Sequence, residues 1–120
     1  MLEFPLEMYS TVTPSKEYPL IITRWQAPLT PSKTLIKQMF ETEGLEPLEE
    51  SFEPQTKIPE HRHPFHEVRM VVSGELLFNI AGNQFLLRPG DRVEVPSNTK
   101  HSHTSQGDDA CICIYAQRPI

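Results

Sequence analysis

The stretch HRHPFHEVRMVVSG, residues 61–74, holds three of the five histidines of the chain. His61 and His63 are two residues apart, and side chains at that spacing on a β-strand project from the same face. Glu67 keeps the same parity if the strand runs on without a bulge. One face of one strand then offers two imidazole nitrogens and a carboxylate, and Gly74 ends the strand. The stretch is therefore a candidate for half of a metal site.

The other two histidines, His101 and His103, lie in a second cluster, HSH. Either would complete a set of three histidines and one glutamate, and the residues alone do not choose between them. Such a set leaves room for two waters or a bidentate substrate in six-coordinate geometry, and mixed nitrogen and oxygen ligation suits Mn, Fe(II), Co, Ni or Zn. The alternative is that these histidines are solvated loop residues near prolines.

Short apolar segments alternate with Gly, Pro, Asn and Asp from residue 45 onward, which is typical of an all-β barrel or sandwich. Residues 46–60 are acidic and contain three prolines, so an extended edge strand or loop is expected there. Six strands are expected after that segment: 67–72, 76–80, 84–87, 92–95, 101–105 and 110–117.

The first part of the chain has a different pattern. Residues 1–19 predict an irregular arm, and the β-branched segment 19–25 predicts a strand. We expect residues 1–44 to form an N-terminal arm, strand and helix that pack on the barrel or on a partner, and residues 45–120 to form the barrel itself.

The one strong helix pattern covers residues 30–44. Thr30 is a candidate N-cap, Pro31 suits the first helical position, and Gly44 can supply the left-handed stop. An apolar stripe recurs at helical spacing: Leu35, Ile36, Met39 and Phe40. A helix this short needs that stripe to be packed, so we expect it against the outside of a sheet or at a dimer contact.

The composition excludes several classes of protein. The chain has 120 residues, the size of one domain, and a net charge of −5 with a pI near 5.5. It has no Lys/Arg cluster, which argues against general nucleic-acid binding. No apolar stretch approaches the roughly 18 residues that span a bilayer, and the N-terminus does not resemble a signal peptide, so a cytoplasmic protein without membrane contact is expected.

The two cysteines, Cys111 and Cys113, are also two residues apart. On a strand they point the same way, at a separation that disfavours a disulfide, and the spacing does not match CxxC motifs. We expect two small buried residues of a core strand.

Residues 61–74 resemble the first motif of the cupin superfamily, HxH-x(3,4)-E-x6-G. Residues 90–101 resemble the second motif, in which Gly90 is followed by five residues, Pro96 and, later, His101. Fifteen residues separate the two motif glycines, as in compact single-domain cupins. Together the motifs cover about the last half of the chain, and they are more specific for the fold than for a reaction.

The second motif departs from the family pattern at two positions. Asn98 stands where the family usually has glycine, and asparagine is the residue other than glycine that best tolerates a positive φ, so we expect the turn to form. The trailing asparagine of the family falls at Ser105, which does not match.

The resemblance implies an all-β fold, a cupin-type antiparallel β-barrel (a double-stranded β-helix, jelly-roll-like) with one N-terminal helix. It implies a divalent transition metal held by His61, His63, Glu67 and His101, and so selects His101 over His103. It also implies a homodimer, with the N-terminal arm and helix as the expected contact.

Arg69 shares the parity of Glu67, so it is a candidate to point into the barrel and bind an anionic substrate. The alternative is a structural ion pair, for example with Glu94. His103 is a candidate to contact substrate or to be a satisfied structural histidine, and the parity of His66 places it on the outside.

The rest of the pocket is expected to be apolar, as in most small-molecule sites. Its candidate lining residues are Val71, Phe78, Ile80, Val93, Val95 and Tyr115. The turn at residues 88–91, RPGD, is expected to connect strands and to have no catalytic role.

Three functions remain open on these residues. The first is a metal-dependent enzyme on a small organic substrate, dioxygenase-like or an isomerase or lyase of sugars or keto acids. The second is a non-catalytic module that binds or senses a small ligand. The third is a structural dimer with a vestigial site, which a complete ligand set argues against.

Overall fold

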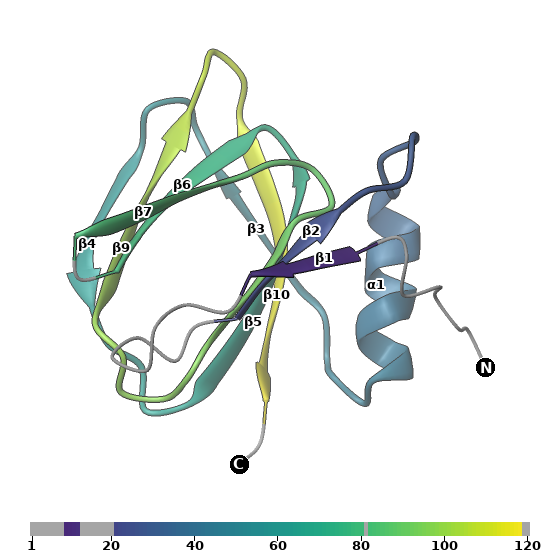
Figure 1. Ribbon diagram of the computed structural model, residues 1–120, viewed down its shortest axis with the longest axis horizontal. Helices are drawn as coiled ribbons and strands as arrows, with labels where there is room; N and C mark the ends of the chain where they lie inside the picture. Colours follow the sequence, from purple (N-terminus) through teal and green to yellow (C-terminus); the bar gives the residue numbers. More distant parts are fainter. Residues whose placement is uncertain (1–8, 13–20, 81, 119–120) are drawn as a thin grey trace.

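The computed structural model describes residues 9–12, 21–80 and 82–118. Two antiparallel sheets face one another, and one helix lies outside the larger sheet (Figure 1). The larger sheet contains, in spatial order, β1 (Tyr9–Val12), β2 (Ile21–Trp25), β8 (Arg92–Val95), β5 (His66–Ser73), β10 (Cys111–Arg118) and β3 (Leu48–Phe52). The smaller contains β4 (Lys57–His61), β9 (His101–Gln106), β6 (Glu75–Ile80) and β7 (Asn83–Leu87). This two-sheet jelly roll confirms the expected fold class, although the sheets do not close into a continuous barrel.

The strand predictions agree closely with the structure. All six strands expected after residue 66 form, each to within one residue at either end. The strand expected over 19–25 is β2, which pairs with β8 in the larger sheet. The arm expected over 1–19 lies outside the described residues except for β1. Residues 46–60 contain two strands, β3 and β4, and each lies at one end of the strand order of its sheet, as proline-rich segments require.

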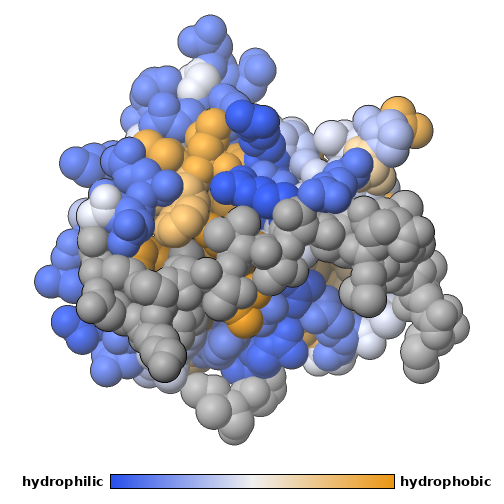
Figure 2. Space-filling model, viewed as in Figure 1, coloured by the Kyte–Doolittle hydropathy of each residue, from blue (hydrophilic) through white to orange (hydrophobic). Residues whose placement is uncertain are grey.

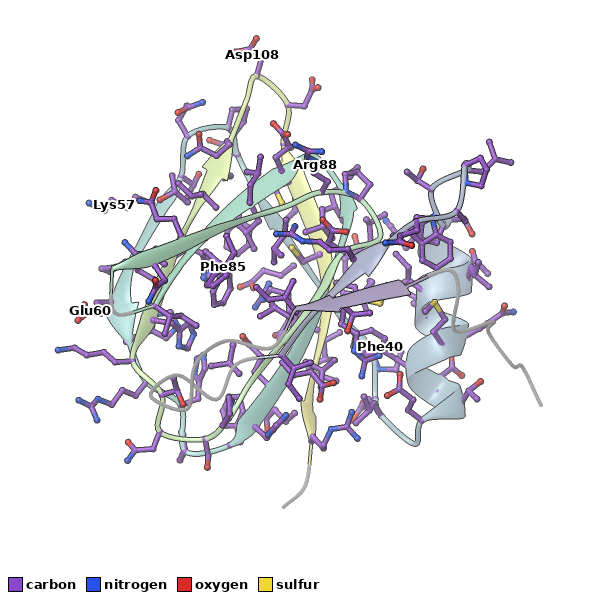
Figure 3. All side chains as sticks on the ribbon, in the orientation of Figure 1. Phe40, Lys57, Glu60, Phe85, Arg88 and Asp108 are labelled. Carbon is purple, nitrogen blue, oxygen red and sulfur yellow. The ribbon has the colours of Figure 1, made fainter. Side chains whose placement is uncertain are left out.

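The inner core lies between the two sheets. Its side chains come from the inward faces of both: Ile22, Phe52, Val71, Leu76, Phe78, Ile80, Leu87, Val93, Val95, Cys111 and Cys113. Phe85 points into the same space and packs against this cluster (Figure 3). The two cysteines are free and buried with their Sγ atoms 3.8 Å apart, which confirms the expectation of small core residues.

A second core lies on the opposite face of the larger sheet, beneath helix α1 (Lys33–Thr42). Strand β5 supplies both cores, because Val71 faces inward while Val68 and Met70 face the helix. A strand buried on both faces is expected to be a near-continuous apolar run, and EVRMVVS has that character apart from its two charged inward positions. Figure 3 shows Phe40 projecting from α1 towards this sheet.

The helix begins later than the sequence predicts. Ser32, not Thr30, is the N-cap, and its Oγ accepts the N–H of Leu35. The prediction of Pro31 at the first helical position is therefore also wrong, since the helix starts two residues later. The apolar stripe is confirmed, with Ile36, Met39 and Phe40 buried, and it packs against the outside of a sheet as expected.

The helix ends as predicted, at Gly44. This residue has φ of 78° and donates its N–H to Glu41, while Leu45 donates to Phe40. These two bonds form a Schellman motif, and Leu45 joins the core beneath the helix. Glu43 then binds Arg92 and Arg118 of the sheet, and although burial would raise the pKa of its carboxyl, these two cations lower it. The helix is thus fastened to the sheet at its C-terminal end.

A buried carboxylate, Asp91, fastens the turn at residues 88–91. Asp91 accepts the backbone N–H of Trp25 and that of Arg88, both at 2.9 Å, and it pairs with Arg24 at 2.9 Å. We call these four residues the Asp91 corner. Its contacts join strand to strand, in agreement with a connecting role for this turn.

The surface in the view of Figure 2 is mostly hydrophilic, with an apolar strip between hydrophilic regions; grey atoms cover part of this face. Within the described ranges, no helix has the length and apolar character needed to cross a membrane.

Candidate metal centre

Three histidines converge at one mouth of the space between the sheets, but not by the route that parity predicts. Strand β4 ends at His61, and the chain then changes sheet before β5 begins at His66. His63 lies in the connection between them, which contains Pro64. The expectation that His61, His63 and Glu67 lie on one face of one strand is therefore wrong, because the strand is interrupted after His61. His61 instead meets His101 as its partner across β4 and β9 of the smaller sheet.

A hydrogen bond between the two sequence motifs holds this connection. Asn98 has φ of 61° and donates its backbone N–H to the carbonyl of His63 at 2.6 Å. The expectation that asparagine forms this turn at positive φ is confirmed. The turn that leads to His101 therefore also fixes the backbone of His63.

His61, His63 and His101 form a group in which one ligating atom from each lies within 4.8 Å of the others. The Nε2 atoms of His61 and His63 are 3.2 Å apart. Two nitrogens held about 2.1 Å from one ion lie roughly 3.0 to 3.4 Å from each other, depending on the angle between them. The observed spacing fits two ligands of a single ion.

Backbone carbonyls set the ring orientation of two of these histidines. Nδ1 of His61 lies 2.7 Å from the carbonyl of Pro59, and Nδ1 of His101 lies 2.8 Å from that of Thr99. A carbonyl only accepts, so each Nδ1 carries the proton and donates it, which leaves the Nε2 lone pair for a metal. Burial lowers the pKa of His101 and of His63, which favours the neutral form that ligates.

Phe78 supports the histidines of β9 from behind. Its ring stacks on His101 and on His103, with centroids 5.4 Å away in both cases. The prediction that Phe78 lines the pocket is wrong, because this ring lies behind the two imidazoles and is itself fully buried.

Glu67 and Arg69 point inward from β5, as their shared parity predicts. Both are 3% exposed, and Nη2 of Arg69 lies 3.3 Å from Oε1 of Glu67. The same Oε1 is 3.6 Å from Nε2 of His63. Glu67 therefore adjoins the three histidines without belonging to their group, and it is shared between His63 and the arginine.

Arg69 has a second carboxylate partner that the sequence did not indicate. Glu50 of β3 approaches its Nη2 at 2.8 Å, and the ring of Tyr115 lies 4.8 Å from its guanidinium carbon. The alternative pairing of Arg69 with Glu94 is wrong, since Glu94 binds His66, Arg92 and Arg118 on the outside. The pairing of His66 with Glu94 also confirms the outward direction of His66.

The Arg69 guanidinium stays charged although it is buried. Burial alone would lower the pKa of Arg69, but the Glu67 carboxylate, the Cys113 thiol and Glu50 raise it.

A cavity of about 250 Å³ opens beside these groups. Its lining residues are Glu50, Phe52, Ile58, His61, His63, Phe65, Glu67, Arg69, His103, Tyr115 and Gln117. The pocket is apolar only in part, because charged and imidazole groups line it together with Phe52, Ile58 and Phe65. Of the predicted lining residues only Tyr115 is present, while Val71, Ile80, Val93 and Val95 belong to the inner core. A larger cavity of about 640 Å³ lies at the Asp91 corner.

Several of these lining residues escaped the sequence analysis. Glu50, Phe52 and Ile58 lie on the two edge strands within the proline-rich segment, and nothing in their local pattern separates pocket from solvent. Phe65 lies inside the first motif, between His63 and His66, and stacks on His63 with centroids 4.7 Å apart. Its position between two histidines is the one signal that could have identified it.

The site also collects unpaired polar atoms. Across residues 21–80 and 82–118, the buried side-chain nitrogens and oxygens that lack a hydrogen-bond partner are Oε2 of Glu67, Nε and Nη1 of Arg69, Nε2 of His101 and both ring nitrogens of His103. Buried polar groups in folded proteins are nearly always paired, so such a cluster requires an explanation. A metal ion would satisfy Oε2 of Glu67 and Nε2 of His101, and an anion would satisfy the arginine.

A sequence profile of the cupin domain matches residues 48–116, more than half of the chain. The chain belongs to the cupin family. Acireductone dioxygenase of Bacillus licheniformis is 42% identical over 60 residues, which cover 46% of this cupin and 34% of the relative. That of Bacillus thuringiensis is 40% identical over a segment of the same length, 35% of the relative. The cupin thus spans about a third of the length of the curated relatives that it matches.

Solved structures share the fold. KdgF from Halomonas sp. superposes with a TM-score of 0.51 and 25% identity, over 62% of this cupin and 70% of that chain. An oxalate oxidase in complex with the substrate analogue glycolate gives 0.55 and 26%, over 63% and 42%. A cupin-like protein from Thermotoga maritima gives 0.56 and 19%, over 88% and 74%, which supports the fold alone. The relatives and the histidine group together indicate a divalent-metal-binding cupin.

Proposed function

We propose that this cupin is a metal-dependent dioxygenase that acts on a small anionic substrate of the enediol type. The observation that carries the proposal is the cluster of unpaired buried atoms on Glu67, Arg69, His101 and His103, which adjoins the three-histidine group. The matched segments of acireductone dioxygenases support the choice of reaction. An acireductone carries an enediol beside a ketone, and its anion is the kind of ligand that a cation and a metal bind together.

In this proposal His61, His63, Glu67 and His101 hold one divalent metal from the set Mn, Fe, Ni, Co and Zn. When bound, the ion supplies Lewis acidity and a template for the substrate and dioxygen. The carbonyl contacts of His61 and His101 keep the ligating Nε2 lone pairs directed into the site. Glu67 can ligate the metal without losing its contact with Arg69. Its Oε2 has no partner and is available to the metal, while its Oε1 keeps the contact with Arg69.

Arg69 orients the substrate anion. Its Nε and Nη1 are unpaired and buried beside the cavity, and the ring of Tyr115 limits its movement. Glu50 occupies the outer side of the guanidinium with a carboxylate that is 40% exposed, so an incoming anion can displace it into water. Phe52, Ile58 and Phe65 form an apolar wall that excludes water from the bound substrate.

The test is dioxygen uptake by the purified chain loaded in turn with Fe(II), Ni and Mn, with an acireductone as substrate. The proposal expects uptake that depends on metal, and both atoms of isotopically labelled dioxygen in the products. His61→Ala should lower the rate by at least about 100-fold, while Lys100→Met, an exposed change next to His101, should leave it within about twofold. Metal-loaded protein that binds the substrate but consumes no dioxygen would instead favour a binding module, and conversion without dioxygen would favour an isomerase.

A homodimer remains part of the proposal, with the helix and the N-terminal segment as its contact. Sedimentation equilibrium tests it directly. A monomer at micromolar concentration would remove the dimer from the account without affecting the site.

A further inference from the structure

We infer that His103 is a specificity-determining residue, which hydrogen-bonds an uncharged hydroxyl or carbonyl oxygen of the substrate beside the anionic group held at Arg69. The inference rests on the proposed function and narrows its substrate class to hydroxylated or keto-bearing small anions. It also gives a role to a histidine that the metal site does not use.

His103 differs from the candidate ligands in its distance from them. The ring centroids of His61, His63 and His101 lie 4.3 to 5.1 Å from one another. The His103 ring lies 6.0 Å from His61 and 6.5 Å from His101, outside the group of three. It lines the cavity that Arg69 and the candidate ligands His61 and His63 also line, so a ligand bound in that cavity would lie beside it.

His103 also differs in its hydrogen bonds. His61 and His101 each have Nδ1 fixed by the carbonyl two residues earlier, which commits the ring to one tautomer. Both nitrogens of His103 lack a partner, and the residue is only 4% exposed. A neutral imidazole in this state can donate at one nitrogen and accept at the other, as a hydroxyl group also can.

A purely structural role does not account for these contacts. Phe78 stacks on the ring, and Phe52 meets it edge-on with centroids 5.3 Å apart. A phenylalanine ring could make these contacts equally well. They fix the position of the imidazole but give neither ring nitrogen a hydrogen-bond partner. An unpaired buried polar group lowers the free energy of unfolding by about 1 to 3 kcal/mol. A phenylalanine at this position would therefore pack the same way in a more stable protein. A substrate-contacting role therefore accounts for His103 better than that of a satisfied structural histidine, since neither ring nitrogen has a protein partner.

The experiment compares glycolate with acetate as probes, because they differ by one hydroxyl group. The full chain is first loaded with Zn²⁺ and its metal content is measured; the dissociation constants of both probes are then measured by calorimetry. Wild type should bind glycolate more tightly than acetate. Part of this preference comes from chelation of the ion, so only its change on mutation tests the role of His103.

His103→Phe should reduce the glycolate preference about tenfold, which is the effect of one hydrogen bond, while zinc content and acetate binding stay within twofold. His103→Gln, which keeps a donor and an acceptor, should restore part of the preference. His66→Phe is the matched control, since this histidine pairs with Glu94 outside the cavity, and it should change nothing.

An unchanged preference in His103→Phe, with zinc bound, would overturn the inference and leave the metal site intact. Zinc-loaded wild type that binds neither probe would overturn it as well. Failure of wild type to take up zinc or any other of the candidate metals would overturn the proposed function, and this inference with it.

Discussion

Glu67 of strand β5 and Asp91 of the turn before β8 are both buried carboxylates, yet they differ in how many hydrogen bonds they accept. Asp91 is 5% exposed, and its two oxygens accept three hydrogen bonds from Arg24, Trp25 and Arg88. Glu67 is 3% exposed, and its Oε2 has no partner at all. The Asp91 corner is complete as the chain folds, whereas the metal centre is complete only with something added. The difference separates polar groups that the fold satisfies from polar groups that the fold leaves without a partner.

Breaking the complete region should have the largest effect on stability. Asp91→Ala removes three hydrogen bonds, one of them from a cation, so the free energy of unfolding should fall by about 3 kcal/mol. The loss should be the same with and without metal, because the corner is remote from the histidines. Urea unfolding at neutral pH measures it, and a loss that appeared only in metal-loaded protein would contradict the separation.

The incomplete region should make the metal-free protein sensitive to acid. Burial, with Arg69 nearby, lowers the pKa of His103 from 6.5 to about 3. Below 6.5 the unfolded chain therefore takes up a proton that the folded chain does not, and stability falls as the pH falls. From about pH 7 to about pH 5 this one group should remove about 2 kcal/mol, a loss that His103→Phe should lack.

The pH dependence is read from urea unfolding of both proteins across that range without metal. His63 and His101 have lowered pKa values of the same origin and contribute to both slopes, so the difference between the proteins isolates His103. Equal slopes would show that the His103 ring is solvated, against its position in the structure.

Replacing a candidate ligand by hydrocarbon should cost the metal-free chain little. His101→Phe keeps the stack on Phe78 and removes the unpaired Nε2, but it also removes the hydrogen bond from Nδ1 to the carbonyl of Thr99. The two effects oppose each other, so the free energy of unfolding without metal should stay within about 1 kcal/mol of wild type. The same change should abolish stabilisation by metal. A loss of more than about 2 kcal/mol in the absence of metal would mean that His101 stabilises the fold, as Asp91 does.

An exposed ion pair beside the centre should matter least. Nζ of Lys100 lies 3.0 Å from Glu60, and both side chains are more than half exposed, so Lys100→Met should cost less than about 0.5 kcal/mol. Metal affinity should stay within twofold. A larger change in affinity, measured by competition with a chelator, would show that surface charge rather than the buried groups sets metal binding.

The two regions also differ in how far the sequence predicted them. Strands β5 to β10 follow from alternation and turn residues, since each is bounded by Gly, Pro, Asn or Asp, and the positive φ of Asn98 follows from its residue type. The inward direction of Arg69 follows from parity within one unbroken strand. These features depend on neighbours in the sequence.

Features that depend on contacts between distant segments did not follow. Parity failed from His61 to Glu67 because the chain changes sheet between β4 and β5. His61 and His101 meet because they are paired across β4 and β9 of the smaller sheet, and His63 reaches them from the connection to β5. Glu50 reaches Arg69 only because β3 pairs with β10. One local feature also did not follow: the helix starts after Ser32 and not after Thr30, because the Ser32 side chain accepts the N–H of Leu35.

The most direct test of the central claim is the metal dependence of unfolding in wild type and in His61→Ala/His101→Ala. Wild type should bind about one divalent transition metal per chain, and at a free metal concentration 1,000 times the dissociation constant its free energy of unfolding should rise by about 4 kcal/mol. The double variant should bind none and gain nothing. No metal in wild type, or equal stabilisation of both proteins, would contradict the assignment of these histidines as a metal centre.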